Sequence, residues 1–193
     1  GHWAGANSPG FAPDVTSYDY DAPINESGQP TPKYWLLRKT LAKYNGGKRL
    51  PSLPDLVNPI AIPQFEFKYV APLFWNLPDT KKDFGIKSME QYDQGFGTIL
   101  YRTTLPRLDI PSRLIVSNAH DYAQIFLNGE FIGKLDRRNH EKEIVLPACE
   151  EGSQLDILVE AMGRINFGRA IKDFKGITEK VEIETKLYGK PFV

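Results

Sequence analysis

The segment from Ile125 to Gly133 places the strictest limit on what this chain can fold into. It consists of two apolar runs separated by Asn128-Gly129. An Asn-Gly pair between two β-prone runs fits a type I′ turn, because both central residues of that turn need positive φ. The segment therefore predicts a tight antiparallel hairpin.

Other short segments carry the same kind of signal. Ile99, Tyr101 and Thr103 alternate with other residues, so their side chains would share one face of a strand. Further strands are predicted at Phe65–Tyr69, Arg113–Ser117, Glu143–Leu146, Leu155–Glu160 and Val181–Thr185. Roughly seven or eight short strands with turn signals and one good helix predict a mainly β fold, a β-sandwich or jelly roll. The segment Phe84–Asp93 fits either a short helix or an ordered loop.

The clearest helix signal begins at Thr31, which can cap a helix, and Pro32 suits its first turn. Gly46 or Gly47 would end the helix. One apolar face recurs at three- and four-residue spacing and consists of Tyr34, Leu37, Leu41 and Tyr44. Residues 48–63 then contain four prolines, Pro51, Pro54, Pro59 and Pro63, which predict an extended linker.

The stretch from Thr16 to Pro23 alternates tyrosine and aspartate. On a strand, Tyr18 and Tyr20 would share one face and Asp19 and Asp21 the other. Flat aromatic rings for sugar C–H faces and carboxylates for hydroxyls suit a sugar site. The alternative is a strand end with turn-prone aspartates. Two carboxylates at i and i+2 project in parallel and do not bracket a scissile bond, so catalysis by this pair is not expected.

The amino-acid sequence of these motifs resembles that of the family 35 glycoside hydrolases, the β-galactosidases. The matching segments are Trp3–Pro9, Thr16–Pro23, Pro32–Tyr34, Leu37-Arg38, Gly97–Leu105, His120–Ala123, Asn128-Gly129, Asp136–Arg138, Leu155–Glu160, Met162–Gly168 and Asp173–Ile177. They keep the family's order and cover nearly the whole chain.

The resemblance implies an architecture. Residues 1–47 would be the C-terminal end of a catalytic (β/α)8 barrel, residues 48–63 a linker, and residues 64–193 a galactose-binding-like β-sandwich. It also implies a retaining enzyme that acts on β-galactoside glycans, with two catalytic glutamates upstream of Gly1, so the chain is expected to be the C-terminal part of a longer enzyme and inactive alone. In the family a tyrosine of this motif reaches the galactose, which makes Tyr20, then Tyr18, the expected substrate contacts, with Trp3 less well supported.

Composition excludes several classes of function. The 24 basic residues balance the 24 acidic ones, which argues against a nucleic-acid surface. No apolar run comes close to the length of about 20 residues that a helix needs to span a bilayer. His2, His120 and His140 lie at no metal-ligand spacing, so no metal or cofactor is expected. The single cysteine, Cys149, is flanked by acids and is expected to be inert.

Three polar motifs are interpreted structurally. His120-Asp121 is expected to be a hydrogen-bonded structural pair. The run from Asp136 to Glu143 balances its charges and predicts a solvated loop, in which Arg137 or Arg138 could still pair with an acid across an interface. The turn Gly163–Gly168 is expected to present Arg164 and Asn166 to another domain.

Two other classes of function remain open, a non-catalytic carbohydrate-binding module and a purely structural domain. A binding module usually exposes a flat row of aromatic residues. The Phe and Tyr residues of the predicted sandwich mostly fall on alternating, core-like positions. That pattern favours a bracing role over independent binding.

Overall fold

The computed structural model of the protein describes residues 3–6, 12–15, 20–165, 169, 171–187 and 190–192. The chain divides into two compact units. One contains the described residues 20–71, and the other contains the N-terminal strands together with residues 72 onward.

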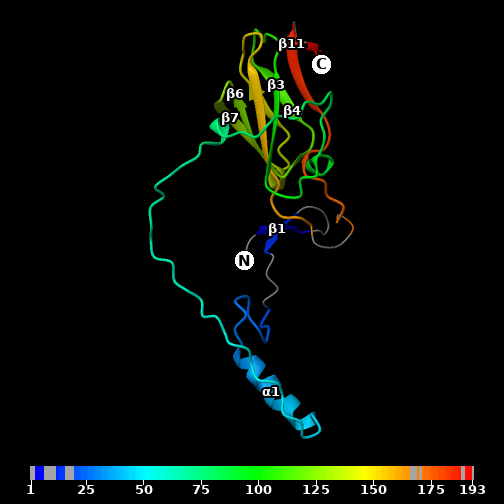
Figure 1. Ribbon diagram of the computed structural model, residues 1–193. Coiled ribbons are helices and arrows are strands. Elements are labelled where there is room, and N and C mark those ends of the chain that lie inside the picture. Colours follow the sequence, from blue (N-terminus) through cyan, green and yellow to red (C-terminus); the bar gives the residue numbers. More distant parts are fainter. Residues whose placement is uncertain are drawn as a thin grey trace. The chain divides into compact units, whose positions relative to one another are not determined.

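The first large sheet of the second unit is four-stranded and antiparallel. Its strands are β3 (Thr98–Thr104), β9 (Gln154–Glu160), β6 (Tyr122–Leu127) and β7 (Glu130–Asp136), in the order β3-β9-β6-β7 (Figure 1). Sequence neighbours β6 and β7 lie side by side, whereas β9 inserts between β3 and β6. The sheet therefore depends on pairing between segments far apart in the sequence.

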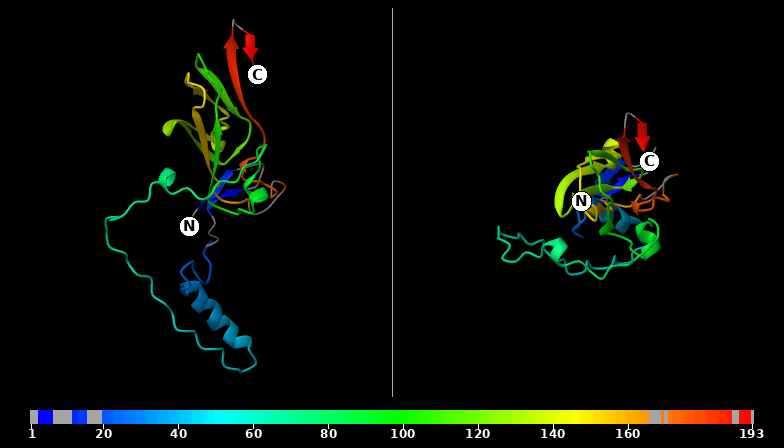
Figure 2. Two further views of the ribbon diagram at one scale, coloured as in Figure 1. Left: turned by 45° about the horizontal axis from the view of Figure 1, so that its top comes forward. Right: turned by 90° about the horizontal axis from the view of Figure 1, so that it is seen from above.

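The second large sheet has the order β12-β11-β4-β8. These strands are β12 (Lys190–Phe192), β11 (Val181–Leu187), β4 (Ser112–Val116) and β8 (Glu143–Leu146), and all neighbours pair antiparallel. Figure 2 shows β11 as a long red strand with the short β12 beside it.

One apolar core joins the two sheets. Along β6 the buried residues Ala123, Ile125 and Leu127 alternate with partly exposed ones, as expected when one face of a strand meets a core. The same core includes Leu114, Val116, Leu146, Leu155, Ile157 and Val159 from the strands of both sheets. The mainly β sandwich predicted from the strand pattern is confirmed.

Two further antiparallel pairs complete the strands. Strand β5 (Ala119–His120) pairs with β10 (Gly176–Ile177). Strand β1 (Trp3–Ala6) pairs with β2 (Ala12–Val15). None of these four strands was predicted from the sequence, because each is short and lacks a clear alternation.

The predicted hairpin is confirmed at Asn128-Gly129. Asn128 has φ 51° and Gly129 has φ 84°, the positive pair that a type I′ turn requires. The side-chain oxygen of Asn128 also accepts a hydrogen bond of 2.8 Å from the backbone N–H of Gln154, which ties the turn to β9.

The predicted helix is also confirmed, as α1 (Pro32–Tyr44) with Thr31 at its N-cap. Instead of capping, the Thr31 hydroxyl donates to the carbonyls of Ala22 and Pro23, at 3.0 and 3.1 Å. No side chain of α1 is buried within its own unit. Among the described residues, no helix combines the length and the apolar character needed to cross a bilayer.

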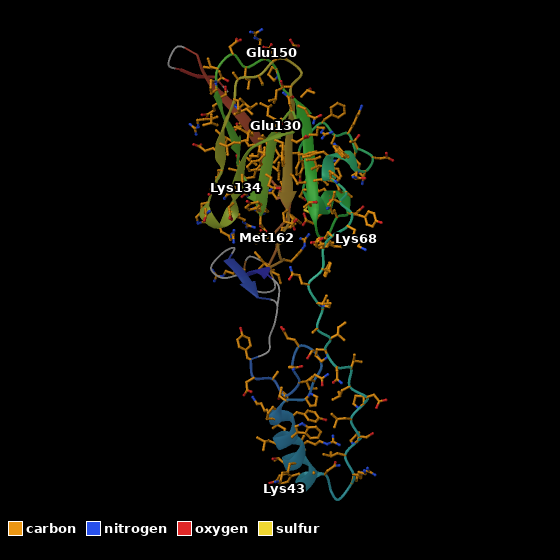
Figure 3. The ribbon with its side chains drawn as sticks, turned by 90° about the vertical axis from the view of Figure 1, so that its left-hand side faces the viewer. Lys43, Lys68, Glu130, Lys134, Glu150 and Met162 are labelled. Atoms are coloured by element: carbon orange, nitrogen blue, oxygen red, sulfur yellow. The ribbon has the colours of Figure 1, made fainter. Side chains whose placement is uncertain are left out.

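The strand predicted at Phe65–Tyr69 is wrong. Residues 48–72 form no helix or strand, and the neighbourhood of Lys68 is drawn as plain extended chain (Figure 3). Phe67 and Tyr69 are 84% and 90% exposed. Alternation sets which way side chains point, but a strand also needs a neighbour that pairs with its backbone. The ambiguous segment Phe84–Asp93 contains the 3-10 helix η2 (Met89–Tyr92).

A close contact fixes β10 against β3. The Tyr101 hydroxyl donates to the Lys87 carbonyl at 2.7 Å and accepts from the Ile177 N–H at 3.0 Å. Gly176 has φ +85°, and a Cβ there would lie 2.3 Å from this hydroxyl oxygen. Only glycine satisfies both the positive φ and the close approach.

Replacing this glycine provides a test of the contact. We expect Gly176→Ala to lower the free energy of unfolding, measured by urea denaturation, by more than Gly129→Ala does. Both glycines have positive φ, but a Cβ at Gly129 meets nothing within 4 Å. Backbone strain costs about 1–2 kcal/mol in each variant, and overpacking adds about 1–3 kcal/mol at Gly176 alone. Equal losses in the two variants would contradict the close contact.

Candidate functional site

The predicted sugar contacts fall near the start of the described chain. Tyr18 and Asp19 lie outside the described residues. Trp3 belongs to β1, but its side chain is not described. Tyr20 lies in a bend rather than a strand, and its side chain is 77% exposed. The prediction that Tyr20 contacts the substrate stays a prediction.

The backbone beside Tyr20 is anchored to α1. Asp21 adopts φ 54°, in the left-handed region, so the chain turns immediately after Tyr20. The ammonium of Lys33 donates to the Asp21 carbonyl at 2.8 Å and to its carboxylate at 3.1 Å. The Asp21 carboxylate therefore has a structural partner inside its own unit.

Helix α1 exposes apolar side chains that a folded protein normally covers. These are Trp35 at 50%, Leu36 at 67%, Leu37 at 45%, Leu41 at 61% and Tyr44 at 82% exposure. Leu37, Leu41 and Tyr44 follow the three- and four-residue spacing of one helix face. That face has no cover within its own unit.

The sandwich unit contains a buried cluster of charges. The Lys175 ammonium, 0% exposed, donates to the carboxylates of Asp121 and Asp173, the latter at 3.0 Å. The Arg137 guanidinium donates to both Asp173 carboxylate oxygens, at 2.9 and 2.8 Å, and to Asp121 at 2.7 Å. Two cations thus meet two anions. We call these four residues the ion cluster.

His120 borders the ion cluster. Its Nδ1 lies 2.6 Å from the Phe174 carbonyl oxygen and 3.3 Å from an Asp173 carboxylate oxygen. Its Nε2 lies 3.0 Å from the side-chain oxygen of Asn118. His120 and Asp121 are both structural, as expected, but the structure shows no direct hydrogen bond between their side chains; both contact residues of the 173–175 segment.

The pKa directions follow from burial and from these contacts. Burial, followed by the nearby Arg137 charge, lowers the pKa of His120 below its usual value of 6.5. Burial alone would raise the pKa of Asp173. Hydrogen bonds and charge from Arg137 and Lys175 lower this pKa by a larger amount, so it lies below its usual value of 3.8. Burial lowers the pKa of Arg137, and its bonds to the two aspartates reverse this to a net rise.

A second set of bonds continues from the ion cluster into η2. The Glu90 carboxylate accepts the Lys175 backbone N–H at 3.0 and 3.1 Å and the Arg164 guanidinium at 2.6 Å. Arg164 also donates twice to the Gly95 carbonyl, at 3.0 and 2.8 Å. The Arg164 guanidinium is thus engaged within its own unit, while the side chain is 43% exposed, and its contact with another domain stays a prediction. Asn166 lies outside the described residues.

The prediction for the mixed-charge run is corrected. Asp136 is 3% exposed, and Arg137 belongs to the ion cluster, so these two residues are not part of a solvated loop. The Asp136 carboxylate accepts the backbone N–H of Arg138 at 3.0 Å and thereby caps the short helix η3 (Arg137–Asn139). Arg137 does form a bidentate pair, with Asp173, but the pair lies within its own unit and not across an interface.

The contacts of the ion cluster indicate a structural role. Its charges satisfy one another, and the described residues contain no group of His, Cys, Asp and Glu that could hold a metal ion. What it does is fix the 173–177 segment against η3 and β5. The segment Asp173–Ile177 was recognised as part of a family motif. No role was assigned to Asp173 or Lys175, because their partners Arg137 and Asp121 lie 36 and 54 residues away.

Comparison with known proteins decides the family. Residues 87–190 match the family model described as β-galactosidase, first all-β domain, and residues 1–44 match that of glycosyl hydrolases family 35. The chain belongs to the family 35 β-galactosidases. The resemblance found in the motifs is thereby confirmed.

Relatives of this chain are named β-galactosidase. It is 35% identical over 181 residues to a β-galactosidase of Xanthomonas manihotis, 91% of this chain and 29% of that protein. It is 36% identical to the β-galactosidase of Bos taurus and 34% identical to that of Homo sapiens, each over 96% of this chain. The chain spans less than a third of the length of these relatives, 29%, 29% and 28%.

Removing one partner of the ion cluster tests its contribution to stability. We expect Lys175→Met to lower the free energy of unfolding by about 3–5 kcal/mol, because it leaves buried carboxylates uncompensated. Lys180→Met is the control, since Lys180 pairs with Glu182 while its side chain is 68% exposed, and exposed pairs contribute little. Urea denaturation measures both. A loss of less than about 1 kcal/mol for Lys175→Met would contradict the cluster.

The pKa of His120 predicts a loss of stability in acid. Because its pKa is lowered by folding, the unfolded chain binds a proton first as the pH falls below 6.5, and the free energy of unfolding falls. Asp173, whose pKa is also lowered by folding, adds a second loss as the pH falls below 3.8. Urea denaturation from pH 8 to pH 5 isolates the first step.

The variant His120→Gln should flatten the decline between pH 7 and pH 5. His140→Asn is its control, because His140 is exposed at the C-cap of η3 and has φ 57°, which asparagine tolerates. A decline that persists unchanged in His120→Gln would assign the acid sensitivity to other groups.

Proposed function

We propose that this chain is part of a retaining β-galactosidase that hydrolyses terminal β-linked galactose from glycans, with its catalytic glutamates upstream of residue 1. The observation that carries this is the pair of family matches in one chain, the glycosyl hydrolase at residues 1–44 and the all-β domain at residues 87–190. A retaining mechanism needs two carboxyl groups about 5–5.5 Å apart. Asp21, paired with Lys33 and exposed, is no candidate for either.

The proposed division of labour follows the sequence. Residues 1–47 complete a catalytic barrel, residues 48–63 form the linker, and residues 64–193 brace the barrel. The uncovered apolar face of α1 supports the first part, because Leu37, Leu41 and Tyr44 require cover from elsewhere in the protein. The ion cluster supports the last part, because it makes the 173–177 segment a rigid element.

We propose Tyr20, and next to it Tyr18, as the residues that contact the galactose. Tyr20 is exposed and stands beside a bend that Lys33 anchors. A tyrosine offers both a ring for the apolar face of a sugar and a hydroxyl for its oxygens. No metal or cofactor has a part in the proposed reaction, because two carboxyl groups suffice for it.

A non-catalytic carbohydrate-binding role is the second candidate. Phe74 packs edge-on against Phe126, with ring centroids 5.0 Å apart, and Phe126 against Phe131, at 5.7 Å. Phe126 points away from the core, because its neighbours Ile125 and Leu127 belong to the core. Phe131 is 56% exposed, and Trp75 beside Phe74 is 84% exposed. These aromatic residues favour a binding surface that the sequence pattern did not suggest.

Hydrolysis of a chromogenic β-galactoside separates the candidates. The protein is assayed as the 193-residue chain and as a chain extended upstream by the rest of the family 35 region. We expect activity only in the extended protein. Activity in the short chain would place catalytic carboxylates within it. Inactivity of both, with binding of galactose oligosaccharides that Trp75→Ala abolishes, would establish the carbohydrate-binding role instead.

A second arm of the same assay tests Tyr20. In the extended protein, Tyr20→Ala should raise KM for the galactoside about tenfold, the loss of about 1.4 kcal/mol of binding. Tyr69→Ala is the control, since Tyr69 is 90% exposed and lies outside the helices and strands and away from the apolar face of α1. Equal kinetics for wild type and Tyr20→Ala would remove Tyr20 from the substrate site.

A further inference from the structure

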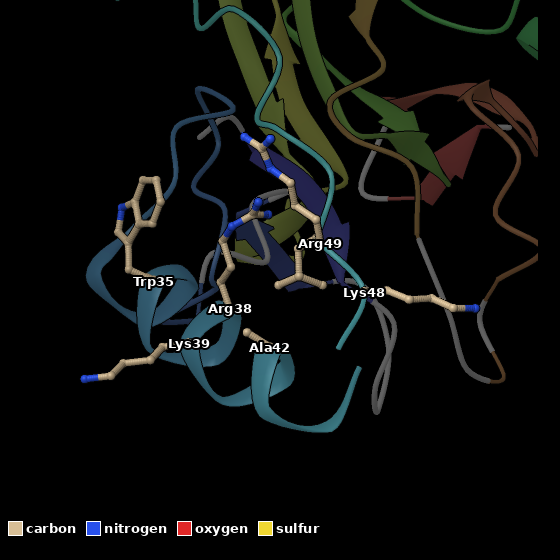
Figure 4. Close-up of a pocket in the computed structure, with 7 residues that line it drawn as sticks. Trp35, Arg38, Lys39, Ala42, Lys48 and Arg49 are labelled. Atoms are coloured by element: carbon tan, nitrogen blue, oxygen red, sulfur yellow. The ribbon is translucent and has the colours of Figure 1, made fainter. Parts of the chain in front are cut away.

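A shallow groove of about 480 Å³ lies along α1. One wall is the helix, with Trp35, Arg38, Lys39 and Ala42, and the other is the returning chain at residues 48–50 (Figure 4). Figure 4 shows the guanidinium groups of Arg38 and Arg49 directed to the same side. This volume is in the range of small-molecule sites, which measure about 300–1,000 Å³.

The groove lies in the most basic part of a neutral chain. The whole chain balances 24 basic against 24 acidic residues. Residues 31–50 contain no Asp or Glu, and their basic residues are Lys33, Arg38, Lys39, Lys43, Lys48 and Arg49. The field in the groove is therefore positive and suits an anion.

Much of this positive charge is left uncompensated inside the protein. Arg38 donates to the Pro51 carbonyl and, at 3.3 Å, to the Tyr34 hydroxyl, which are both neutral acceptors. Throughout the part of the chain that the structure describes, Lys39, Lys48 and Arg49 form no ion pair with an acidic side chain. A ligand with anionic groups would supply the missing partners.

The groove and the apolar face of α1 lie on different sides of the helix. At 3.6 residues per turn, Leu37, Leu41 and Tyr44 follow one stripe, and Trp35 and Ala42 follow the opposite one. Covering the apolar face with the rest of the protein would therefore leave the groove open. Trp35, which is 50% exposed, offers it a flat aromatic wall.

We propose that this groove binds an acidic saccharide, a galactose-containing chain that bears sulfate or carboxylate groups. Guanidinium forks bind sulfate and carboxylate oxygens in pairs, as Arg49 can do here. The aromatic ring of Trp35 can accept the apolar face of a sugar. A ligand that is only acidic, such as an acidic protein surface, would need the cations but not this ring. The galactose content rests on the proposed function, whereas the acidic-sugar chemistry rests on the groove alone.

Titration calorimetry at low and moderate salt tests the groove in the extended protein. The probes are a sulfated galactan oligosaccharide, a galacturonic acid oligosaccharide and a neutral galactose oligosaccharide of similar length. We expect one or both acidic probes to bind and the neutral probe not to bind. Arg49→Gln and Trp35→Ala should each weaken the acidic probe about tenfold, and the circular dichroism of each variant checks that α1 persists.

Lys43→Gln is the matched control, because Lys43 is a cation of the same helix that does not line the groove. It should change the affinity less than twofold. Equal weakening by Lys43→Gln and Arg49→Gln, or no binding of either acidic probe, would overturn the proposal. Polyglutamate binding as tightly as the acidic saccharides, with no effect of Trp35→Ala, would assign the groove to an acidic protein surface instead.

This outcome is separable from that of the proposed function. Calorimetry reports binding whether or not the protein hydrolyses a galactoside. A protein that binds the acidic probes but has no β-galactosidase activity would retain the groove and lose the proposed reaction. An active protein that ignores the acidic probes would retain the reaction and lose the groove.

Discussion

The fold of the sandwich unit depends on how Lys175 is neutralised. An ammonium that is fully buried is tolerated only when carboxylates surround it, and here they come from Asp121 and Asp173. Asp121 follows β5, Asp173 leads into β10, and Arg137 of η3 binds both. Four charges from separate elements must therefore arrive together. Desolvation of the four charges offsets much of their attraction, so the net contribution of the cluster to stability is smaller than its number of contacts suggests.

Features that are encoded locally were predictable from the sequence. The hairpin at Asn128-Gly129 and the helix after Thr31 each depend on a few adjacent residues, and both are confirmed. The strand predicted at Phe65–Tyr69 failed although its alternation is equally clear. A hairpin carries its own partner strand, whereas an isolated alternating segment needs a distant one that the sequence does not name. The short strands β5 and β10 show the converse, since they pair although their sequences contain no alternation of apolar and polar residues that would predict a strand.

The residues of functional interest divide in the same way. Tyr20 was identified because its motif resembles that of a known family, and the structure adds that the residue is exposed and lies in a bend. Lys175 lies in an equally recognisable motif, yet its role required knowledge of partners 54 residues away. Arg164 was assigned to a neighbouring domain because the family resemblance places its turn near the barrel. Its carbonyl acceptor at Gly95 and its acid Glu90, 69 and 74 residues distant, could not be read from the turn.

Helix α1 connects the two proposals about function. A helix of 13 residues is marginal in water unless packing supports it, and no side chain of α1 is buried within its own unit. Its apolar stripe therefore has to be covered by another part of the protein for the helix to be stable. Cover on that stripe leaves the stripe of Trp35 and Ala42 in solvent, and the cations beside it keep that surface soluble. One short helix would thus serve both the proposed attachment to a catalytic barrel and the proposed basic groove.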